Sequence, residues 1–313
     1  MHDLFGNAYI RKTEPLGIPY MGSKRKYADT LISRIMDLAP HAKYFYDICG
    51  GGAMTFAALQ KGFIVHYNEL QSDMCELMRY ICNPTTSRYG IFPEHFYEFI
   101  TRKKFIELRN QSGLYAQFAR ICYSFGNKQT SYAFGRDVEP LKQAAHNAVM
   151  YQCKQSMDKV SEILGVDLQV SDLPTWNERR LKFGQAIKSN KKRLDLQQLE
   201  QLQQLERLQQ LPNITITNLS YNDVQITTPP HETIIYLDPP YRGTAKYIES
   251  LNYDELDAWF AGLPCIAFMS EYNAPFRCVH EIKTRSTLSP TNNNAVKIER
   301  LYINDPIPQD VTT

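Results

Sequence analysis

The sequence of 313 residues predicts an α/β fold, in which a mostly parallel sheet carries helices on both faces and a mostly helical segment is inserted. Four apolar runs predict buried strands, at 44–50, 63–67, 233–237 and 265–270. Strands that are apolar on both sides are typical of parallel sheets covered by helices. Residues 54–59 predict a helix between the first two strands, so this part of the chain forms one βαβ unit.

The segment 84–212 differs in composition from the rest of the chain. It carries 19 Lys and Arg against 13 Asp and Glu, a net charge of +6, whereas the remainder carries −4. We therefore predict a catalytic sheet domain from 1–83 and 213–313 and an inserted domain from 84–212. The basic excess fits a polyanion that contacts mainly the insert, because Lys and Arg supply most sequence-independent affinity for nucleic acids. A solvated polar insert is the alternative.

The insert ends with a leucine at every third position, from Leu196 to Leu211. A step of three residues falls about 60° short of a full helical turn, so the leucines wind around the whole cylinder. The pattern predicts a short, partly buried helix and argues against a coiled-coil seam. A flexible low-complexity spacer is the alternative.

Composition also limits the class of protein. A hydrophobic share of 43% is ordinary for a folded chain, and no apolar run approaches the roughly 18 residues of a membrane span. The first residues show no export signal, so we expect a soluble, cytoplasmic protein without membrane contact. The seven cysteines form no Cys-x-x-Cys pair, which argues against a zinc site and a disulfide framework, and no metal is expected.

The motif Asp238-Pro239-Pro240-Tyr241 directly follows the strand 233–237, at the carboxyl end where α/β sheets bind ligands. An exocyclic base amine is a poor nucleophile, because its lone pair is delocalised into the ring. The Asp238 carboxylate and the Pro239 carbonyl can accept its two N–H groups and aim the lone pair at a methyl donor. The two prolines fix the backbone, and an extruded base can stack on Tyr241. A proline-terminated strand with a capping Asp is the alternative.

A glycine cluster at Gly50, Gly51 and Gly52 follows Asp47 and the first predicted strand. Glycines at such a turn let the backbone approach a ligand closely, and Glu69, after the next strand, can accept both hydroxyls of a ribose. The spacing differs from Gly-x-Gly-x-x-Gly, and no Walker lysine follows. A nucleoside is therefore favoured over a dinucleotide or a nucleoside triphosphate, and a tight packing turn explains the glycines equally well.

Tyr20 and Lys24 form a third patch, before a helix that is predicted to begin near residue 27. Lys24 can reach the carboxylate of a methionine moiety, and Tyr20 can pack beside its sulfonium, since cations are favoured near aromatic faces. A basic helix start is the alternative.

Together these motifs resemble the Dam-like family of DNA adenine methyltransferases, which has a lysine-bearing motif, a glycine-rich motif and Asp-Pro-Pro-Tyr in this order. The resemblance covers about 1–83 and 213–313, and Glu69 stands where the family usually has Asp. It implies a Rossmann-like sheet that moves a methyl group from S-adenosylmethionine to the N6 amine of an adenine flipped out of duplex DNA, leaving S-adenosylhomocysteine. The cofactor-binding residues that it implies are Tyr20, Lys24, Asp47, Gly50, Gly51, Glu69, Tyr221 and Asp238.

The resemblance also makes 84–212 the target-recognition region, although this insert is longer than in compact members. The DNA contacts that it implies are Asn127, Lys128, Tyr132 and Arg136. Methylation of the exocyclic amine of cytosine, and an inactive protein that binds cofactor and DNA, are the alternatives. The resemblance sets neither the recognised sequence nor the oligomeric state, and it fits both an orphan enzyme and a member of a restriction-modification system.

Overall fold

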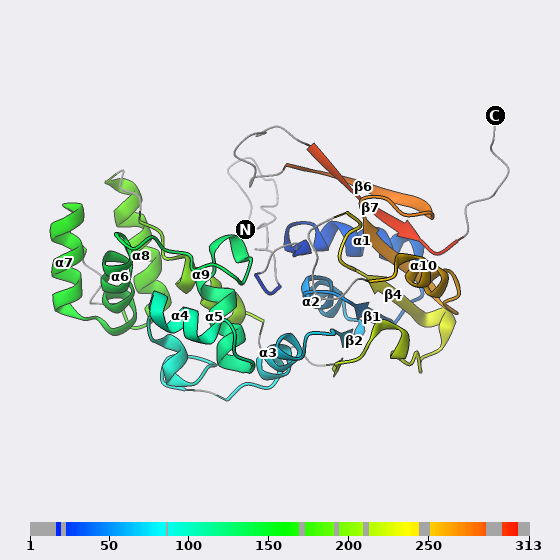
Figure 1. Ribbon diagram of the computed structural model, residues 1–313, viewed down its shortest axis with the longest axis horizontal. Coiled ribbons are helices and arrows are strands. Elements are labelled where there is room, and N and C mark those ends of the chain that lie inside the picture. Colours follow the sequence, from blue (N-terminus) through cyan, green and yellow to red (C-terminus); the bar gives the residue numbers. More distant parts are fainter. Residues whose placement is uncertain are drawn as a thin grey trace, which may run out of the picture.

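The computed structural model describes residues 17–19, 23–85, 87–168, 173–190, 194–208, 213–243, 251–285 and 296–305. The described chain forms a sheet lobe and a helical lobe that lie side by side (Figure 1). The N-terminal and C-terminal parts of the chain build the sheet lobe, and the middle of the chain builds the other.

A mixed sheet forms the centre of the first lobe. Its strands are β1 (Tyr44–Ile48), β2 (Ile64–Asn68), β3 (Ile214–Thr217), β4 (Thr233–Leu237), β5 (Ile266–Glu271), β6 (Arg277–Arg285) and β7 (Val296–Ile303). The sheet has seven strands in the order β3-β2-β1-β4-β5-β7-β6. The first five strands run parallel, whereas β7 pairs antiparallel with both β5 and β6. All four predicted strands are therefore confirmed, together with the α/β class.

Helices cover both faces of this sheet, as predicted. They are α1 (Ala28–Leu38), α2 (Ala53–Gln60), α3 (Ser72–Cys82) and α10 (Tyr253–Ala261). Phe45 packs in an apolar cluster with α1 and α2, and the next residue, Tyr46, packs in the cluster with α10. Successive side chains of a strand point to opposite faces, so one apolar run supplies both layers. The sheet is consequently buried on both sides.

The middle of the chain is helical. Its helices are α4 (Arg102–Leu108), α5 (Leu114–Tyr123), α6 (Glu139–Tyr151), α7 (Lys154–Leu164), α8 (Trp176–Ser189) and α9 (Gln197–Glu206). One continuous apolar cluster contains Phe56 and Tyr67 from the sheet lobe and Phe118 and Leu199 from the helical lobe. The two lobes therefore share a core. Within the described part of the chain, no helix is long and apolar enough to cross a membrane.

The leucine repeat forms α9, which confirms the predicted buried helix and shows that the spacer alternative is wrong for 197–206. Leu199, Leu202 and Leu205 are buried, and Gln198 and Gln201 are buried between them. A helix that is enclosed on most of its circumference needs apolar side chains on several faces. This enclosure explains why the leucines wind around α9.

Candidate active site

The motifs that follow β1, β2 and β4 meet at one edge of the sheet. β1 lies between β2 and β4, and Ile48 and Leu237 end their strands side by side. The amide of Asp238 donates to the carbonyl of Ile48 at 3.2 Å, which joins the proline turn to the glycine turn. This edge, formed by the carboxyl ends of parallel strands, is where such sheets bind ligands.

Asp47 lies buried near the end of β1 and faces α2. Its Oδ2 accepts hydrogen bonds from the amide of Thr55 at 2.9 Å and from the Thr55 hydroxyl at 2.6 Å. Its Oδ1 is buried and has no hydrogen-bond partner among the described residues. Burial raises the pKa of Asp47 to about 7, because the charged carboxylate loses its hydration. A donor brought by a ligand can satisfy this second oxygen.

The glycine turn leaves no room for side chains beside that carboxylate. A Cβ at Gly50 would lie only 2.4 Å from Asp47 Oδ1. Gly52 has a φ of 81°, which an L side chain rarely adopts, and Gly51 between them is buried. Cys49 adopts a left-handed φ of 62°, an uncommon conformation for a residue with a side chain. These contacts show a turn that is packed tightly against Asp47, and close approach of a ligand to its backbone stays a prediction.

Glu69 directly follows β2 and lies at the same edge. Its carboxylate accepts the amide of Gln71 at 2.9 Å, and burial raises its pKa to about 7. The side-chain amide of Asn218 donates to the carbonyls of Glu69 and Leu70 at 2.7 and 2.8 Å. These bonds brace the loop that carries the acidic side chain.

Tyr221 lies in the 3-10 helix η4 (Tyr221–Asp223), in the segment that leads from β3 to β4. Its ring packs edge-on against Trp259 of α10, with the ring centroids 5.1 Å apart. Tyr20, the other aromatic residue predicted to contact the cofactor, lies outside the described residues.

Lys24 opens the 3-10 helix η1 (Lys24–Lys26) and lies against Asp238. Its Nζ is 2.7 Å from Asp238 Oδ1 and 3.0 Å from Glu299 Oε1, and the three side chains are 6%, 8% and 13% exposed. Burial alone would lower the pKa of Lys24, but the two carboxylates raise it above its ordinary value. Burial raises the pKa of Asp238 to about 6, against the opposing effect of Lys24. Two buried carboxylates thus share one ammonium.

The ring of Tyr241 completes this cluster. Its hydroxyl donates to the same Oε1 of Glu299 that contacts Lys24, and the Lys24 ammonium lies 4.7 Å from the ring centroid. Tyr272 packs edge-on against Tyr241 at a centroid distance of 4.6 Å. One face of Tyr241 is therefore occupied by the ammonium, which must move before a base can stack there.

The proline turn is braced on both sides. The hydroxyl of Tyr253 donates to the carbonyl of Pro240 at 2.8 Å, and the amide of Arg242 donates to the Glu271 carboxylate at 3.0 Å. Pro239, one residue earlier, is buried. Its own ring fixes φ and the following Pro240 restricts its ψ, so the Pro239 carbonyl has few directions open to it.

The family model of the D12 class N6 adenine-specific DNA methyltransferases matches residues 20–262, which is more than half of the chain. The chain belongs to this family. It is an S-adenosylmethionine-dependent enzyme that methylates the N6 position of adenine in DNA, which confirms the predicted function over the alternative of cytosine methylation. A comparison with curated protein sequences finds no match.

The sheet edge of this D12 class methyltransferase fits a cationic nucleoside. S-adenosylmethionine carries a sulfonium and an ammonium, which buried carboxylates favour. The edge supplies the unpartnered oxygen of Asp47, the carboxylate of Glu69, and one more carboxylate than ammonium in the cluster of Lys24, Asp238 and Glu299. Within the described residues, no group of His, Cys, Asp and Glu could hold a metal ion.

The stretch of the methyltransferase that is predicted to read DNA forms a hairpin loop after α5. The amide of Phe125 donates to the Ser131 carbonyl at 2.7 Å, and the amide of Ala133 donates to the Tyr123 carbonyl at 2.8 Å. The 3-10 helix η3 (Phe125–Asn127) lies at the tip, where the Phe125 side chain is 57% exposed. We refer to residues 124–132 as the hairpin loop.

The structure separates the four residues that are predicted to contact DNA. Lys128 and Arg136 are exposed, and Asn127 ends η3 at the tip of the hairpin loop. Tyr132 is buried instead, and its hydroxyl donates to the Ile100 carbonyl at 2.8 Å. In this arrangement Tyr132 anchors the base of the loop in the core.

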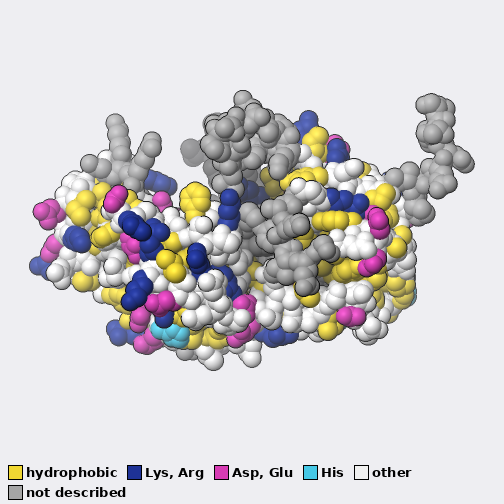
Figure 2. Space-filling view, in the orientation of Figure 1, with side chains coloured by type: hydrophobic (Ala, Val, Ile, Leu, Met, Phe, Trp, Pro, Cys, Tyr) yellow, Lys and Arg dark blue, Asp and Glu magenta, His cyan; other side chains and the backbone are white. Residues whose placement is uncertain are grey.

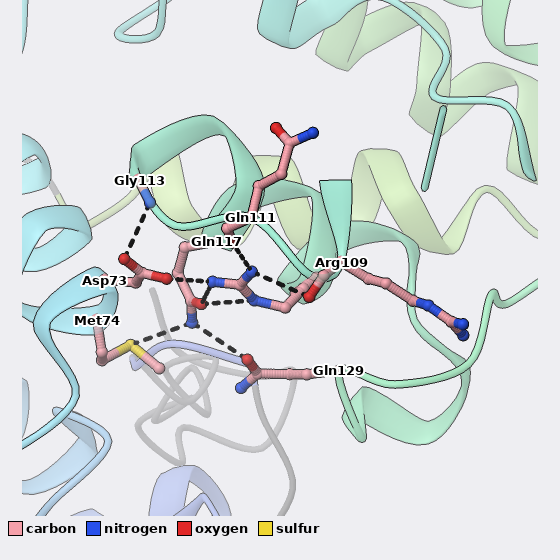
Figure 3. A network of polar contacts seen from close by, with 8 residues as sticks. Asp73, Met74, Arg109, Gln111, Gly113, Gln117 and Gln129 are labelled. Atoms are coloured by element: carbon pink, nitrogen blue, oxygen red, sulfur yellow. Dashed lines mark hydrogen bonds and ion pairs between the residues drawn. The ribbon is translucent and has the colours of Figure 1, made fainter. Parts of the chain in front are cut away.

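A partly buried polar network joins the hairpin loop to the first turn of α3 (Figure 3). Arg120 on α5 contacts Asp73 at 2.6 Å and donates to the side-chain oxygen of Gln117 at 2.7 Å. Gln117 in turn donates to Gln129 in the hairpin loop at 3.3 Å. Asp73 is the fourth residue after Glu69 and begins α3 with Ser72. No local sequence pattern predicts this connection, because the four side chains come from separate segments of the chain.

Basic side chains of the helical lobe include one that contacts the hairpin loop. Lys103 and Lys104 are exposed on α4, and exposed Arg109 donates to the Thr130 carbonyl in the loop at 3.2 Å. Figure 2 shows Lys and Arg side chains gathered on the visible face of the helical lobe, with Asp and Glu among them. This charge was predicted from composition, but its placement beside the loop was not.

Proposed function

We propose that this methyltransferase takes an adenine out of duplex DNA and holds its N6 amine between the Asp238 carboxylate and the Pro239 carbonyl. The observation that carries the proposal is the position of Asp238. It is a buried carboxylate at the carboxyl edge of the sheet, on a turn that two prolines and two hydrogen bonds fix. Such a rigid pair of acceptors can orient an amine without reorganising.

The cofactor supplies an electrophilic methyl group on its sulfonium. Asp238 accepts one N–H of the amine and Pro239 accepts the other, which directs the nitrogen lone pair out of the base plane. After methyl transfer the nitrogen carries one proton too many. Asp238 can accept that proton, since burial raises its pKa to about 6, toward neutrality.

In this mechanism Lys24 leaves Asp238 Oδ1, so that the amine can bind there. We propose that the methionine carboxylate of the cofactor becomes its new partner, which agrees with the role predicted from the sequence. The same movement uncovers the face of Tyr241 on which the base stacks. Cofactor binding thus prepares the site for the adenine.

The remaining edge residues bind the cofactor in this proposal. Asp47 accepts the methionine ammonium on its unpartnered oxygen, and Gly50 and Gly51 let the backbone approach. Glu69 accepts the ribose hydroxyls, and Tyr221 with Tyr20 contacts the adenosine and sulfonium ends.

We further propose that 84–212 is the target-recognition domain. Its hairpin loop presents Asn127 and Lys128 to DNA, and Arg136 with the exposed cations of α4 contacts phosphates. Phosphate contacts position a protein on the duplex, whereas contacts to base edges specify the sequence. Tyr132 contributes by anchoring the loop.

The proposal is tested by replacing Asp238 with Asn. The control is Asp37→Asn, an exposed carboxylate on α1. With tritiated S-adenosylmethionine and duplex DNA, we expect Asp238→Asn to slow transfer to adenine by about a hundredfold or more. Its cofactor affinity stays within about threefold of the wild type, since Asp47 and Glu69 are intact. An Asp238→Asn enzyme that is as fast as Asp37→Asn excludes the proposed role.

A further inference from the structure

Glu299 is a largely buried acid that the family match does not include. The matched residues end at 262, whereas Glu299 lies on β7. β7 runs antiparallel to β5 with Arg300 opposite Glu271, the last residue of β5. Glu299 therefore lies just beyond the carboxyl end of β5, at the same edge as Asp238. The C-terminal hairpin of β6 and β7 thus delivers a carboxylate to the proposed site.

One oxygen of Glu299 contacts two residues to which we assign roles. Its Oε1 is 3.0 Å from Lys24 Nζ and accepts the hydroxyl proton of Tyr241. The side chain is only 13% exposed, so neither contact is exchanged freely for water. Hydrogen bonds to a buried charge are stronger than neutral ones and restrict geometry more closely. Glu299 therefore links the ammonium of Lys24 to the hydroxyl end of Tyr241.

The arrangement matters when Asp238 changes partners. In the proposed mechanism Asp238 releases Lys24 to accept the adenine amine, and an ammonium left without a carboxylate in a buried site is costly. Glu299 remains bonded to Lys24 while the ammonium pivots away from Asp238 and from the ring face of Tyr241. The hydroxyl of Tyr241 stays anchored as well, so the stacking ring keeps its orientation.

We propose that Glu299 is a positioning residue for methyl transfer, which holds Lys24 and Tyr241 while Asp238 exchanges the ammonium for the target amine. This inference rests on the proposed function. The ionisable groups that face Glu299 are Lys24 on η1, Tyr236 on β4, and Asp238 and Tyr241 after β4.

The test compares Glu299→Gln with Glu281→Gln, an exposed carboxylate on β6 that pairs with Arg300 at 2.8 Å. We expect Glu299→Gln to lower kcat by about tenfold or more, the effect of losing a hydrogen bond to a charged group, with little change in the KM for DNA. Glu281→Gln keeps wild-type values. Wild-type kcat in a folded Glu299→Gln enzyme overturns the inference.

A pH profile separates positioning from support of the fold. The charge of Glu299 contributes to the raised pKa of Asp238, so its removal moves the acid limb of kcat to lower pH. If Glu299 only supports the fold, Glu299→Gln lowers the melting temperature and leaves the acid limb of kcat in place. That result also overturns the inference. If Glu299→Gln does not fold, Tyr241→Phe removes one of the two contacts, and an unchanged kcat then has the same meaning.

Asp238→Asn is measured in the same experiment. A fully active Asp238→Asn enzyme contradicts the proposed function, and it contradicts the inference on Glu299 as well. An inactive Asp238→Asn enzyme beside a fully active Glu299→Gln enzyme removes the inference alone. Loss of kcat in both variants, with a shifted acid limb in Glu299→Gln, supports both.

Discussion

Replacing Lys24 by Met removes the only ammonium that Asp238 and Glu299 share among the described residues. At 2.7 and 3.0 Å, and with an effective dielectric constant of about 20, each attraction is about 6 kcal/mol before desolvation offsets it. Loss of one partner of a buried ion pair costs about 3–5 kcal/mol. We expect about 3 kcal/mol at pH 8, which lowers the melting temperature by roughly 6 °C.

The loss should depend on pH in one direction. Without Lys24 the pKa of Asp238, which burial already raises to about 6, rises further above its value in the unfolded chain, because the cation that opposed the effect of burial is gone. The folded variant then binds more protons than the unfolded one, and its stability increases as the pH falls. The deficit relative to the wild type should therefore be largest at pH 8 and clearly smaller at pH 5.5.

Thermal unfolding followed by circular dichroism measures this deficit for the cofactor-free protein. Lys26→Met, two residues away in η1 and exposed, is the matched control. It should melt within about 1 °C of the wild type at both pH values, as exposed substitutions usually do. A Lys24→Met deficit that is equal at pH 5.5 and pH 8, or no larger than that of the control, contradicts a stabilising role of Lys24 between the two carboxylates.

Three further predictions concern the methyl transfer itself. Single-turnover transfer requires ionised Asp238, whose pKa is raised to about 6, so the rate should fall as the pH drops through about 6; a rate that is flat from pH 5 to 8 contradicts this role. Gly50→Ala should weaken cofactor binding by about tenfold in calorimetry, because the new Cβ would lie 2.4 Å from Asp47 Oδ1. The control is Gly184→Ala, whose Cβ meets no atom within 4 Å and which should bind the cofactor as the wild type does. Gln117→Leu removes the side chain that links Arg120 to Gln129 in the hairpin loop, so it should raise the KM for DNA by about tenfold and leave cofactor affinity unchanged. The control is Gln111→Leu, at an exposed position. Equal KM values for the two variants contradict a role of the network in DNA binding.

Much of the sheet lobe could be predicted because its signals are local. A continuous apolar run marks each buried parallel strand, and the prolines and glycines mark where β1 and β4 end. Parallel strands bring their carboxyl ends to one edge, so Asp47, Glu69 and Asp238 could be placed together without knowing the sheet order. The leucine repeat likewise predicted α9, since its spacing alone required burial on several faces.

Other features depend on contacts that no local pattern records. Glu299 reaches the site only because β7 pairs antiparallel with β5, and neither that pairing nor β6 was predicted. Lys24 was expected at the cofactor, whereas its contact with Asp238 follows from how η1 packs. Tyr132 lies in a stretch of polar and basic composition, which favoured an exposed position. Tyr132 and Phe134 are two residues apart, and both rings are buried in the core. Composition does not record this alternation, whereas the order of the residues does.

The most direct test of the account is a crystal structure of the enzyme with S-adenosylhomocysteine and duplex DNA that contains its recognition site. We predict an extruded adenine on the ring of Tyr241, with its N6 nitrogen about 3 Å from both the Asp238 carboxylate and the Pro239 carbonyl, and with Lys24 moved away from Asp238. An adenine bound elsewhere, or an Asp238 carboxylate that remains on Lys24 while the base is extruded, would contradict it.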